Sequence, residues 1–279
     1  MYNPYINKIY LYERESEKNN TIIEELKENN YSLIIDLQNN FRTYKISSYL
    51  KVPTKKFNKH SLDKFLLVNF KINNLKGEPQ IPERYAKTLN ESELDNEGLD
   101  LFINDVTSSI NKKEKKYVGF APGARHFTKR WPKEFYVDLG KKLVYDGYSI
   151  LLFGGKEDNE ICSEISSLIP GSINLCNEGE ILKTAAGMKE CIAVVCNDSG
   201  LMHAACAMKV PVLVFFGSSV KELGFTPYKS KNLILENKSL SCRPCSHIGR
   251  ERCPKKHFKC MLELTPGIAY QKLLELLNP

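Results

Sequence analysis

Between residues 117 and 217 the chain alternates short apolar runs with segments of helical periodicity. The runs "YVGFAPG", "YSILLFGG", "IAVVCND" and "VPVLVFFG" are nearly all apolar and lack the alternation of a half-exposed strand. Single helical segments, such as "PKEFYVDLGKKLVYDG", separate them. Strands that are apolar on both faces and joined by helices are typical of a parallel sheet covered on both sides. This part of the chain is therefore predicted to be a parallel α/β domain.

The first 113 residues have a different pattern. They contain a helical segment around "TIIEELKENN", one convincing strand, "YSLIIDL", and then a long passage rich in Lys and Asn. The polar run "NKKEKK" at 111–116 is typical of a linker. The sequence thus predicts an incomplete N-terminal Rossmann-like domain over 1–113 and a C-terminal Rossmann-like domain over 114–279. The second contains a Cys-rich segment at 242–260 and a terminal helix over 265–277, with Ile268, Leu273, Leu274 and Leu277 on one face.

Composition excludes some classes and leaves others open. A chain of 279 residues that is 42% hydrophobic can bury the cores of two domains. No apolar run approaches the roughly 18 residues of a membrane span, and the N-terminus lacks the layout of a signal peptide, so a cytoplasmic protein is predicted. The net charge of +7 fits a solvated surface, and it also fits attraction to an anionic membrane surface or to phosphorylated ligands.

The segment "VVCNDSGLMHAAC" places a polar triplet where a buried strand passes into a helix. In open parallel sheets, ligands bind beyond the carboxyl ends of the strands, where helix N-termini present free N–H groups to phosphate. Ser199 and Gly200 stand at this position behind Asp198, and His203 follows one turn later. The triplet is a candidate phosphate site. The alternative is that Asp198 or Ser199 only caps the helix.

Two further strand ends carry similar signals. In "FAPGARHFTKRWP", Gly123 and Ala124 open a loop with three cations, which suit a diphosphate: Arg125, Lys129 and Arg130. In "FGGKEDNE", Glu157 and Asp158 could accept hydrogen bonds from ribose hydroxyls, although acidic residues also favour the first turn of any helix. Three strand ends with complementary chemistry together favour a phosphate-bearing ligand.

The nine cysteines fall into two groups. Five stand in apolar contexts and are expected to fill the core as reduced thiols: Cys162, Cys176, Cys191, Cys196 and Cys206. The other four have the spacing C-x2-C-x7-C-x6-C: Cys242, Cys245, Cys253 and Cys260. Four thiolates could hold a structural zinc ion, and reduced thiols or an oxidation-sensitive pair are the alternatives. Each alternative gives the segment a structural role.

The segments "GFAPGARHFTKRWP", "LLFGGKEDNEI", "CNDSGLMHAACAMKVPVLVFFG" and "GFTPY" resemble, in this order, glycosyltransferase family 9, the ADP-heptose:lipopolysaccharide heptosyltransferases. The resemblance implies a GT-B fold with two Rossmann-like domains and parallel sheets. It also implies inverting transfer of a sugar from a nucleotide-diphosphate sugar to a lipopolysaccharide core acceptor at the inner membrane surface, without a catalytic metal. In such chains the terminal helix is expected to return to the N-terminal half.

The resemblance also assigns roles to residues. Lys129 would bind the donor diphosphate, Glu157 or Asp158 the ribose, and the residues behind Asp198 the phosphate and sugar. The implied donor-binding set is Gly123, Ala124, Arg125, Lys129, Glu157, Asp158, Asp198, Ser199, Gly200, Leu201 and His203. "IIDLQNNFRT" resembles the family's "DLQGN" segment and would place Asp36, Gln38 and Arg42 near the interdomain cleft, with Asn39 in place of the usual glycine.

One departure concerns the catalytic base. Family members begin with a strand and a Gly-Asp loop whose aspartate is assigned as general base, whereas this sequence starts at "NPYINKIYLYER", which aligns downstream of that loop. Either Asp36 or another acid replaces this base, or the chain is a truncated form that binds donor without transfer. A third alternative is a zinc-ribbon nucleic-acid-binding protein, against which stand the position of the basic loop at a strand end and the scarcity of aromatic residues in the Cys-rich segment.

Overall fold

The computed structural model describes residues 3–13, 18–90, 94–103, 110, 116–176 and 180–278. The chain divides into two compact units: a first unit of Met1–Leu62 with Gly77–Asp95, and a second unit of Asp63–Lys76 with Asn96–Pro279. Residues 63–76 belong to the second unit, where Leu67 and Leu75 are buried together with Leu223. Most of the predicted linker, residues 111–115, lies outside the described residues, so the boundary at 113 stays a prediction.

The first unit is built on a very short parallel sheet. Its strands pair over three residues each, with Ile34 opposite Thr54 and Asp36 opposite Lys56. The second strand, "TKK", is polar and carries no apolar pattern, so the sequence predicts only one strand in this half. The elements are α1 (Lys18–Glu28), β1 (Ile34–Asp36), α2 (Phe41–Leu50), β2 (Thr54–Lys56) and α4 (Ile81–Lys87).

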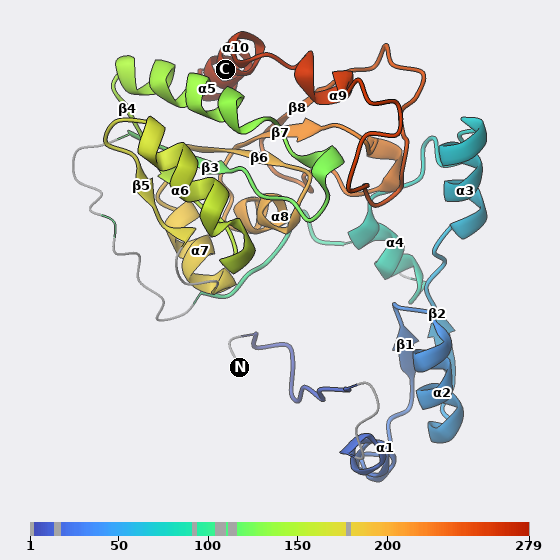
Figure 1. The fold of residues 1–279 in the computed structure, drawn as a ribbon. Helices are drawn as coiled ribbons and strands as arrows, with labels where there is room; N and C mark the ends of the chain where they lie inside the picture. Colours follow the sequence, from blue (N-terminus) through green and yellow to red (C-terminus); the bar gives the residue numbers. More distant parts are fainter. Residues whose placement is uncertain are drawn as a thin grey trace. The chain divides into compact units, whose positions relative to one another are not determined.

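The second unit contains six parallel strands in the order β5-β4-β3-β6-β7-β8 (Figure 1). This confirms the predicted α/β class with a parallel sheet. Its elements are α3 (Ser61–Phe70), which begins at the border of the two units, β3 (Lys116–Ala121), η1 (Phe127–Lys129), α5 (Lys133–Tyr145), β4 (Tyr148–Leu152), η2 (Lys156–Asp158), α6 (Asn159–Leu168), β5 (Ile173–Asn174), α7 (Ile181–Met188), β6 (Ala193–Asn197), α8 (Gly200–Ala207), β7 (Val212–Phe216), η4 (Lys221–Leu223), β8 (Asn232–Glu236), α9 (Lys259–Leu262) and α10 (Pro266–Leu277).

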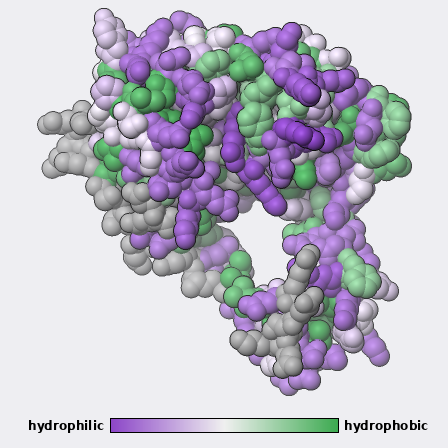
Figure 2. Space-filling view, in the orientation of Figure 1, coloured by the Kyte–Doolittle hydropathy of each residue, from purple (hydrophilic) through white to green (hydrophobic). Residues whose placement is uncertain are grey.

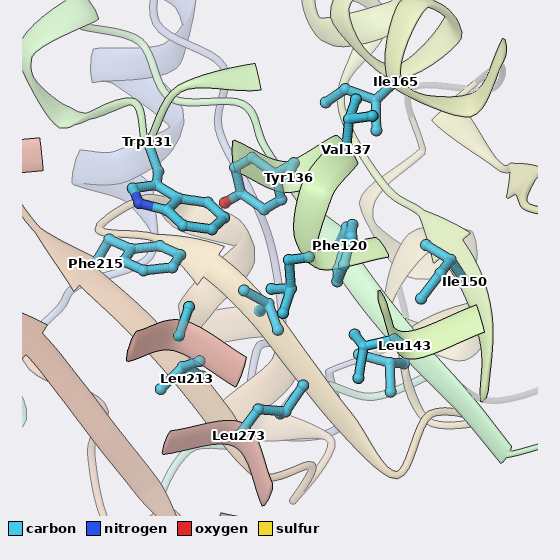
Figure 3. Packing of buried hydrophobic residues seen from close by; sticks show 14 of the residues in the cluster. Phe120, Trp131, Tyr136, Val137, Leu143, Ile150, Ile165, Leu213, Phe215 and Leu273 are labelled. Atoms are coloured by element: carbon cyan, nitrogen blue, oxygen red, sulfur yellow. The ribbon is translucent and has the colours of Figure 1, made fainter. Parts of the chain in front are cut away.

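Each face of the large sheet carries its own apolar core, because successive side chains of a strand point to opposite sides. On one face, Phe120, Leu213 and Phe215 pack with residues of α5, α6 and α10 (Figure 3). On the other, Val194 and Val214 pack with residues of α7 and α8. All residues of β6 and β7 are buried, which accounts for the absence of polar alternation in their sequences.

Helix α10 confirms the predicted terminal helix and corrects one detail. Its buried residues are Ala269, Leu273 and Leu276, whereas Ile268 is 43% exposed, so the face differs from the one predicted. The helix packs on α5, β7 and β8 within the second unit, and its return to the N-terminal half stays a prediction. Among the described residues, no helix has both the length and the apolar character needed to cross a membrane.

Candidate functional site

Strands β3 and β6 are neighbours at the centre of the large sheet, and the strand order reverses between them. From β3 the chain continues to β4 on one side, and from β6 to β7 on the other. In sheets of this kind the ligand crevice lies beyond the carboxyl ends of the two strands at the reversal. The predicted loops at 122–131 and 198–199 both begin at this point, because Ala121 pairs with Cys196 in the register.

Asn197, the last residue of β6, joins the two loops. Its side chain is fully buried; Oδ1 accepts the backbone N–H of Trp131 at 2.9 Å, and Nδ2 donates to the Pro122 carbonyl at 2.7 Å. This residue was not predicted from the sequence. An amide at the last position of an otherwise apolar strand was the available signal.

Lys129 and Asp198 form an ion pair across the two strand ends. Lys129 Nζ lies 2.7 Å from Asp198 Oδ2, and the side chains are only 16% and 6% exposed. The same oxygen accepts a hydrogen bond of 2.5 Å from Ser219 Oγ, in the loop after β7. The carboxylate is thereby fixed from two sides, and it holds the ammonium group of Lys129 at the ends of β3 and β6.

Helix α8 starts directly beside this pair. Ser199 is its N-cap residue but makes no capping hydrogen bond, and its Oγ is buried without a hydrogen-bond partner among the described residues. Gly200 borders open space. A buried donor or acceptor normally has a partner, so the hydroxyl and the N–H groups of the first turn could bind a polar ligand together.

His203 belongs to the same neighbourhood. Burial lowers the pKa of its imidazole below the usual 6.5; the nearby Asp198 carboxylate opposes this shift, and Lys129 adds to it. The ring is therefore neutral at pH 7 and carries one N–H donor. Leu201, between the triplet and the histidine, packs on the apolar core beneath α8.

The third predicted strand end, after β4, contacts the loop that follows β3. Asp158 Oδ2 accepts the N–H of Gly155 at 2.9 Å, and its carboxylate lies against Gly123, where a Cβ would overlap it. Gly123 is thus required by close approach. Glu157 is exposed beside Asp158. Their assignment to a ribose stays a prediction.

The other two cations of the basic loop are oriented differently. Arg125 and Arg130 are exposed, and Arg130 Nε donates to the carbonyl of Ala124 at 2.7 Å. Of the three predicted cations, Lys129 is therefore the one paired with Asp198.

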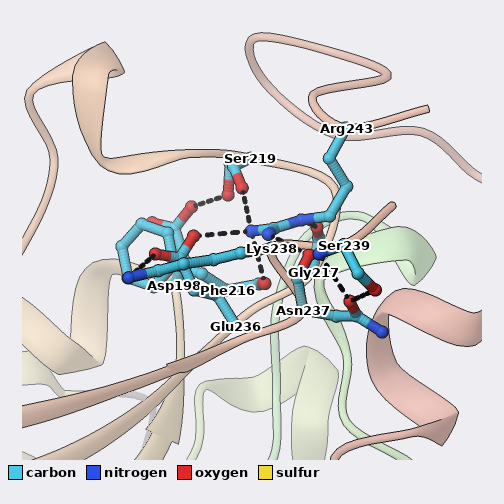
Figure 4. A network of polar contacts seen from close by, with 9 residues as sticks. All are labelled: Asp198, Phe216, Gly217, Ser219, Glu236, Asn237, Lys238, Ser239 and Arg243. Atoms are coloured by element: carbon cyan, nitrogen blue, oxygen red, sulfur yellow. Dashed lines mark hydrogen bonds and ion pairs between the residues drawn. The ribbon is translucent and has the colours of Figure 1, made fainter. Parts of the chain in front are cut away.

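A buried arginine supports the loop that carries Ser219 (Figure 4). The Arg243 side chain is 5% exposed, and its Nη2 lies 3.0 Å from Glu236 Oε2. The guanidinium also donates to four carbonyls, those of Phe216, Gly217, Ser219 and Asn237, at 2.6–2.9 Å. Arg243 therefore holds the chain between β7 and Ser219 in place, and through Ser219 it supports Asp198. The sequence showed no sign of this role.

Asp36 lies in the first unit and is 5% exposed. Its Oδ1 accepts the N–H groups of Gln38 and Asn39 at 3.0 and 2.6 Å, and its Oδ2 accepts Thr43 Oγ1 at 2.6 Å. These bonds shape the turn from β1 into α2, where Arg42 lies over the ring of Tyr12. Asp36 thus has a structural task, and its role as a base stays a prediction.

All nine cysteines are free thiols. The five expected in the core are buried, and burial raises their pKa. Among the described residues, which include the whole 242–260 segment, no three His, Cys, Asp or Glu side chains gather in a way that could hold a metal ion. Cys242 Sγ lies 3.8 Å from His257 Nε2. The zinc hypothesis therefore still rests on sequence spacing.

A model of glycosyltransferase family 9 (heptosyltransferase) matches residues 20–256. The chain is 31% identical over 176 residues to lipooligosaccharide heptosyltransferase 2 of Campylobacter jejuni subsp. jejuni; the alignment covers 61% of this chain and 54% of the relative, so it spans about half of that protein.

Solved structures show the same fold. A family 9 glycosyl transferase from Veillonella parvula matches with a TM-score of 0.76 and 19% identity, over 99% of this chain and 84% of that chain. An E. coli heptosyltransferase with ADP-2-deoxy-2-fluoro heptose matches with a TM-score of 0.59 and 18% identity, over 94% and 78%. The predicted GT-B fold is confirmed. On this evidence, the chain belongs to glycosyltransferase family 9, the heptosyltransferases.

Proposed function

We propose that this chain binds a nucleotide-diphosphate sugar, of the ADP-heptose type, at the β3 and β6 strand ends and transfers the sugar to a lipopolysaccharide core acceptor. The observation that carries the proposal is the convergence of Lys129, Ser199 and His203 on the N-terminus of α8. A cation, an unpartnered hydroxyl, a neutral imidazole and free N–H groups in one place are the groups that a diphosphate requires.

These groups also suit the chemistry of transfer. When the sugar leaves, negative charge grows on the diphosphate oxygens, and preorganised donors stabilise that charge. Lys129 provides the full positive charge, while Ser199 and His203 provide neutral donors. Asp198 holds Lys129 in position through the ion pair. We propose that no catalytic metal is required, since these groups can neutralise the leaving group.

The relatives support the donor and acceptor classes. The C. jejuni relative is a lipooligosaccharide heptosyltransferase 2, and the E. coli structure contains an ADP-heptose analogue. We propose the same classes here, with inversion at the anomeric carbon and an acceptor presented at the inner membrane surface. A ¹H NMR assignment of the anomeric configuration of the product, compared with that of the donor, tests inversion.

Calorimetry with ADP and ADP-heptose tests the donor site. Lys129→Ala should weaken ADP binding about tenfold or more, because a charge-assisted contact is lost. Lys133→Ala is the matched control, since Lys133 is nearby in sequence but pairs with Glu164 on the surface. Circular dichroism checks that the variants fold.

Ser199→Ala provides a second variant that leaves the Lys129 ion pair intact, and it should weaken ADP binding several-fold. Unchanged ADP affinity in both variants would contradict the proposal. A salt-sensitive affinity for duplex DNA, without ADP binding, would instead support the nucleic-acid alternative. Donor binding without formation of a heptosylated product would identify a non-catalytic nucleotide-sugar-binding chain.

A further inference from the structure

Helix α2 of the first unit (Figure 1) turns three aromatic side chains toward water. Phe41 is 83% exposed, Tyr44 55% and Tyr49 48%, whereas Ser47, on the other side of the helix, is buried. The three rings share one face because an α-helix repeats about every 3.6 residues. Figure 2 shows hydrophobic residues at the surface of the first unit in this view, between hydrophilic ones. Large side chains gathered on one exposed face are typical of a binding surface.

The segment that contains this face is strongly basic. Residues 37–62 contain no Asp or Glu, and their six cations are Arg42, Lys45, Lys51, Lys55, Lys56 and Lys59. Two of the lysines reach the aromatic face itself: Lys45 Nζ lies 6.0 Å from the ring centroid of Tyr49, and Lys56 Nζ lies 5.1 Å from that of Tyr44. Within the described part of the chain, neither lysine forms an ion pair. The aromatic face therefore carries positive charge that no neighbouring carboxylate neutralises.

Exposed rings accompanied by lysines suit the interface of an anionic membrane. Aromatic side chains bind at the level of the lipid headgroups, and Lys and Arg are attracted by the negative surface potential. Two other partners fit less well. A single-stranded nucleic acid requires a groove that follows its backbone, whereas α2 presents a convex helix face. A second copy of this chain, docked face to face, would bring cations against cations.

We propose that the outer face of α2, formed by Phe41, Tyr44, Lys45, Tyr49 and Lys56, binds an anionic membrane surface. The rings insert between the headgroups, and the ammonium groups contact the lipid phosphates. This inference goes beyond the proposed function, because vesicle binding requires neither donor nor acceptor. It can therefore be tested whether or not the chain transfers a sugar.

Sedimentation with lipid vesicles tests the charge of this face. The full chain should bind vesicles of equal parts phosphatidylglycerol and phosphatidylcholine, and bind phosphatidylcholine vesicles much more weakly. Added salt should weaken the binding, because it screens the surface potential. Lys45→Gln/Lys56→Gln should lower the vesicle affinity about tenfold or more, since each cation at an anionic surface contributes about fivefold.

Lys27→Gln/Lys87→Gln is the matched control. It removes the same charge at exposed positions of α1 and α4 in the same unit, and it should bind vesicles nearly as tightly as the unaltered chain. An equal loss of affinity in both double variants would reduce the effect to net charge and overturn the assignment to α2.

The Phe41→Trp variant tests insertion directly. The chain's single tryptophan, Trp131, is fully buried, so its emission should change little on binding. With the anionic vesicles, emission of the variant should shift to shorter wavelength, and brominated phosphatidylcholine should quench it. Tyr145→Trp, at a position that is 91% exposed on α5, is the control and should show neither effect. Vesicle binding without a shift in Phe41→Trp would mean that another surface contacts the membrane.

Phe41→Ala/Tyr49→Ala removes two rings and leaves the lysines in place. It should weaken vesicle binding about tenfold or more. Alanine favours the helix, and circular dichroism checks that α2 still forms. Unchanged vesicle affinity in this variant would contradict the role of the rings. ADP affinity, measured by calorimetry, should be the same in every variant, so this inference and the proposed donor site fail separately.

Two further outcomes would overturn the membrane assignment. The full chain could bind single-stranded RNA and no vesicles, which would assign the face to a nucleic acid. Alternatively, it could sediment as a dimer that Phe41→Ala/Tyr49→Ala dissociates, again without vesicle binding, which would assign the face to a second copy of the chain.

Discussion

The two units obtain their structure in different ways. In the second unit, the central strands β6 and β7 are buried along their whole length, and helices cover both faces of the sheet. In the first unit, β1 and β2 pair over three residues, and Leu33, Ile35 and Leu37 are each about 40% exposed. A two-stranded sheet cannot bury both faces, so less apolar area leaves water there.

Polar contacts contribute a larger part of the stabilising interactions in the first unit. Asp36 accepts three hydrogen bonds within its turn, and Asn40 and Thr43 form a capping box at the start of α2. Local bonds of this kind fix backbone conformation but contribute only modestly to net stability. The comparison indicates that apolar packing determines the stability of the second unit, whereas local turn and cap chemistry determines much of that of the first.

The largest effect is expected from removing a core aromatic in each unit. Trp131 is fully buried, stacks on Phe215 at 4.1 Å and donates Nε1–H to Leu264, so Trp131→Ala should lower the unfolding free energy by about 3–5 kcal/mol. Phe57→Ala, next to the ring of Tyr85 in the first unit, should cost less, because fewer apolar groups surround it. Urea denaturation followed by circular dichroism measures both. Equal costs would contradict the comparison.

The next largest difference in unfolding free energy is expected from replacing one buried arginine in each unit. Arg243→Met would leave the buried Glu236 with only the exposed Lys238, 3.8 Å away, and would remove the donor to four carbonyls, at a cost of about 3 kcal/mol. Arg84 in the first unit is also buried; burial lowers its pKa, and the nearby Glu78 carboxylate opposes this shift. Arg84→Met should cost less, because the Glu78 carboxylate that interacts with Arg84 is 34% exposed to water, whereas Glu236 is 10% exposed. Thermal unfolding of both variants tests this; a larger loss for Arg84→Met would reverse the order.

A smaller effect concerns pH and His203. Its pKa is lowered in the folded state, so the unfolded chain takes up the proton first as the pH falls below 6.5. The contribution of neutral His203 to the unfolding free energy is therefore fully present above pH 6.5, and it decreases as the pH falls toward the pKa of the folded state. His203→Gln should make the unfolding free energy less dependent on pH in this window. Urea midpoints at pH 7.5 and 5.5 measure the difference, and an unchanged slope would show that another group titrates.

The sequence predicted the large sheet well because burial on both faces leaves a direct signal in strands such as β6 and β7. The sequence also predicted that the loops around Lys129 and Ser199 lie together, since the carboxyl ends of parallel strands lie at the same edge of a sheet. It missed β2, whose three polar residues form a strand only because β1 lies beside it. Tertiary pairing overrides local propensity in such cases.

The supporting residues of the site were missed for a related reason. Asn197 and Arg243 donate buried hydrogen bonds to the carbonyls of other segments. The residue type alone does not predict which carbonyls an asparagine or an arginine will bind. The predicted face of α10 was wrong because the helix buries the small Ala269 while it leaves Ile268 in water. The side that a helix buries is set by its neighbours as well as by its own periodicity.

The smallest expected effects come from two matched helix caps. Asn40 accepts the N–H of Thr43 at 3.0 Å in the first unit, and Thr265 accepts that of Ile268 at 3.4 Å in the second. Each substitution by alanine should cost about 1 kcal/mol or less. The two variants should lose stability in different parts of the molecule, because α10 covers a continuous core whereas α2 buries only Ser47.

Hydrogen exchange distinguishes these two consequences. Asn40→Ala should speed exchange of the α2 amides by up to about fivefold and leave the amides of β6 and β7 unchanged, since a locally stabilised helix opens locally. Thr265→Ala should instead lower the midpoint of the second unit's main unfolding transition, because α10 cannot leave without exposing Leu273 and Leu276. If Asn40→Ala also shifted that transition, the two units would unfold as one cooperative body, and the distinction between core-determined and cap-determined stability would have to be abandoned.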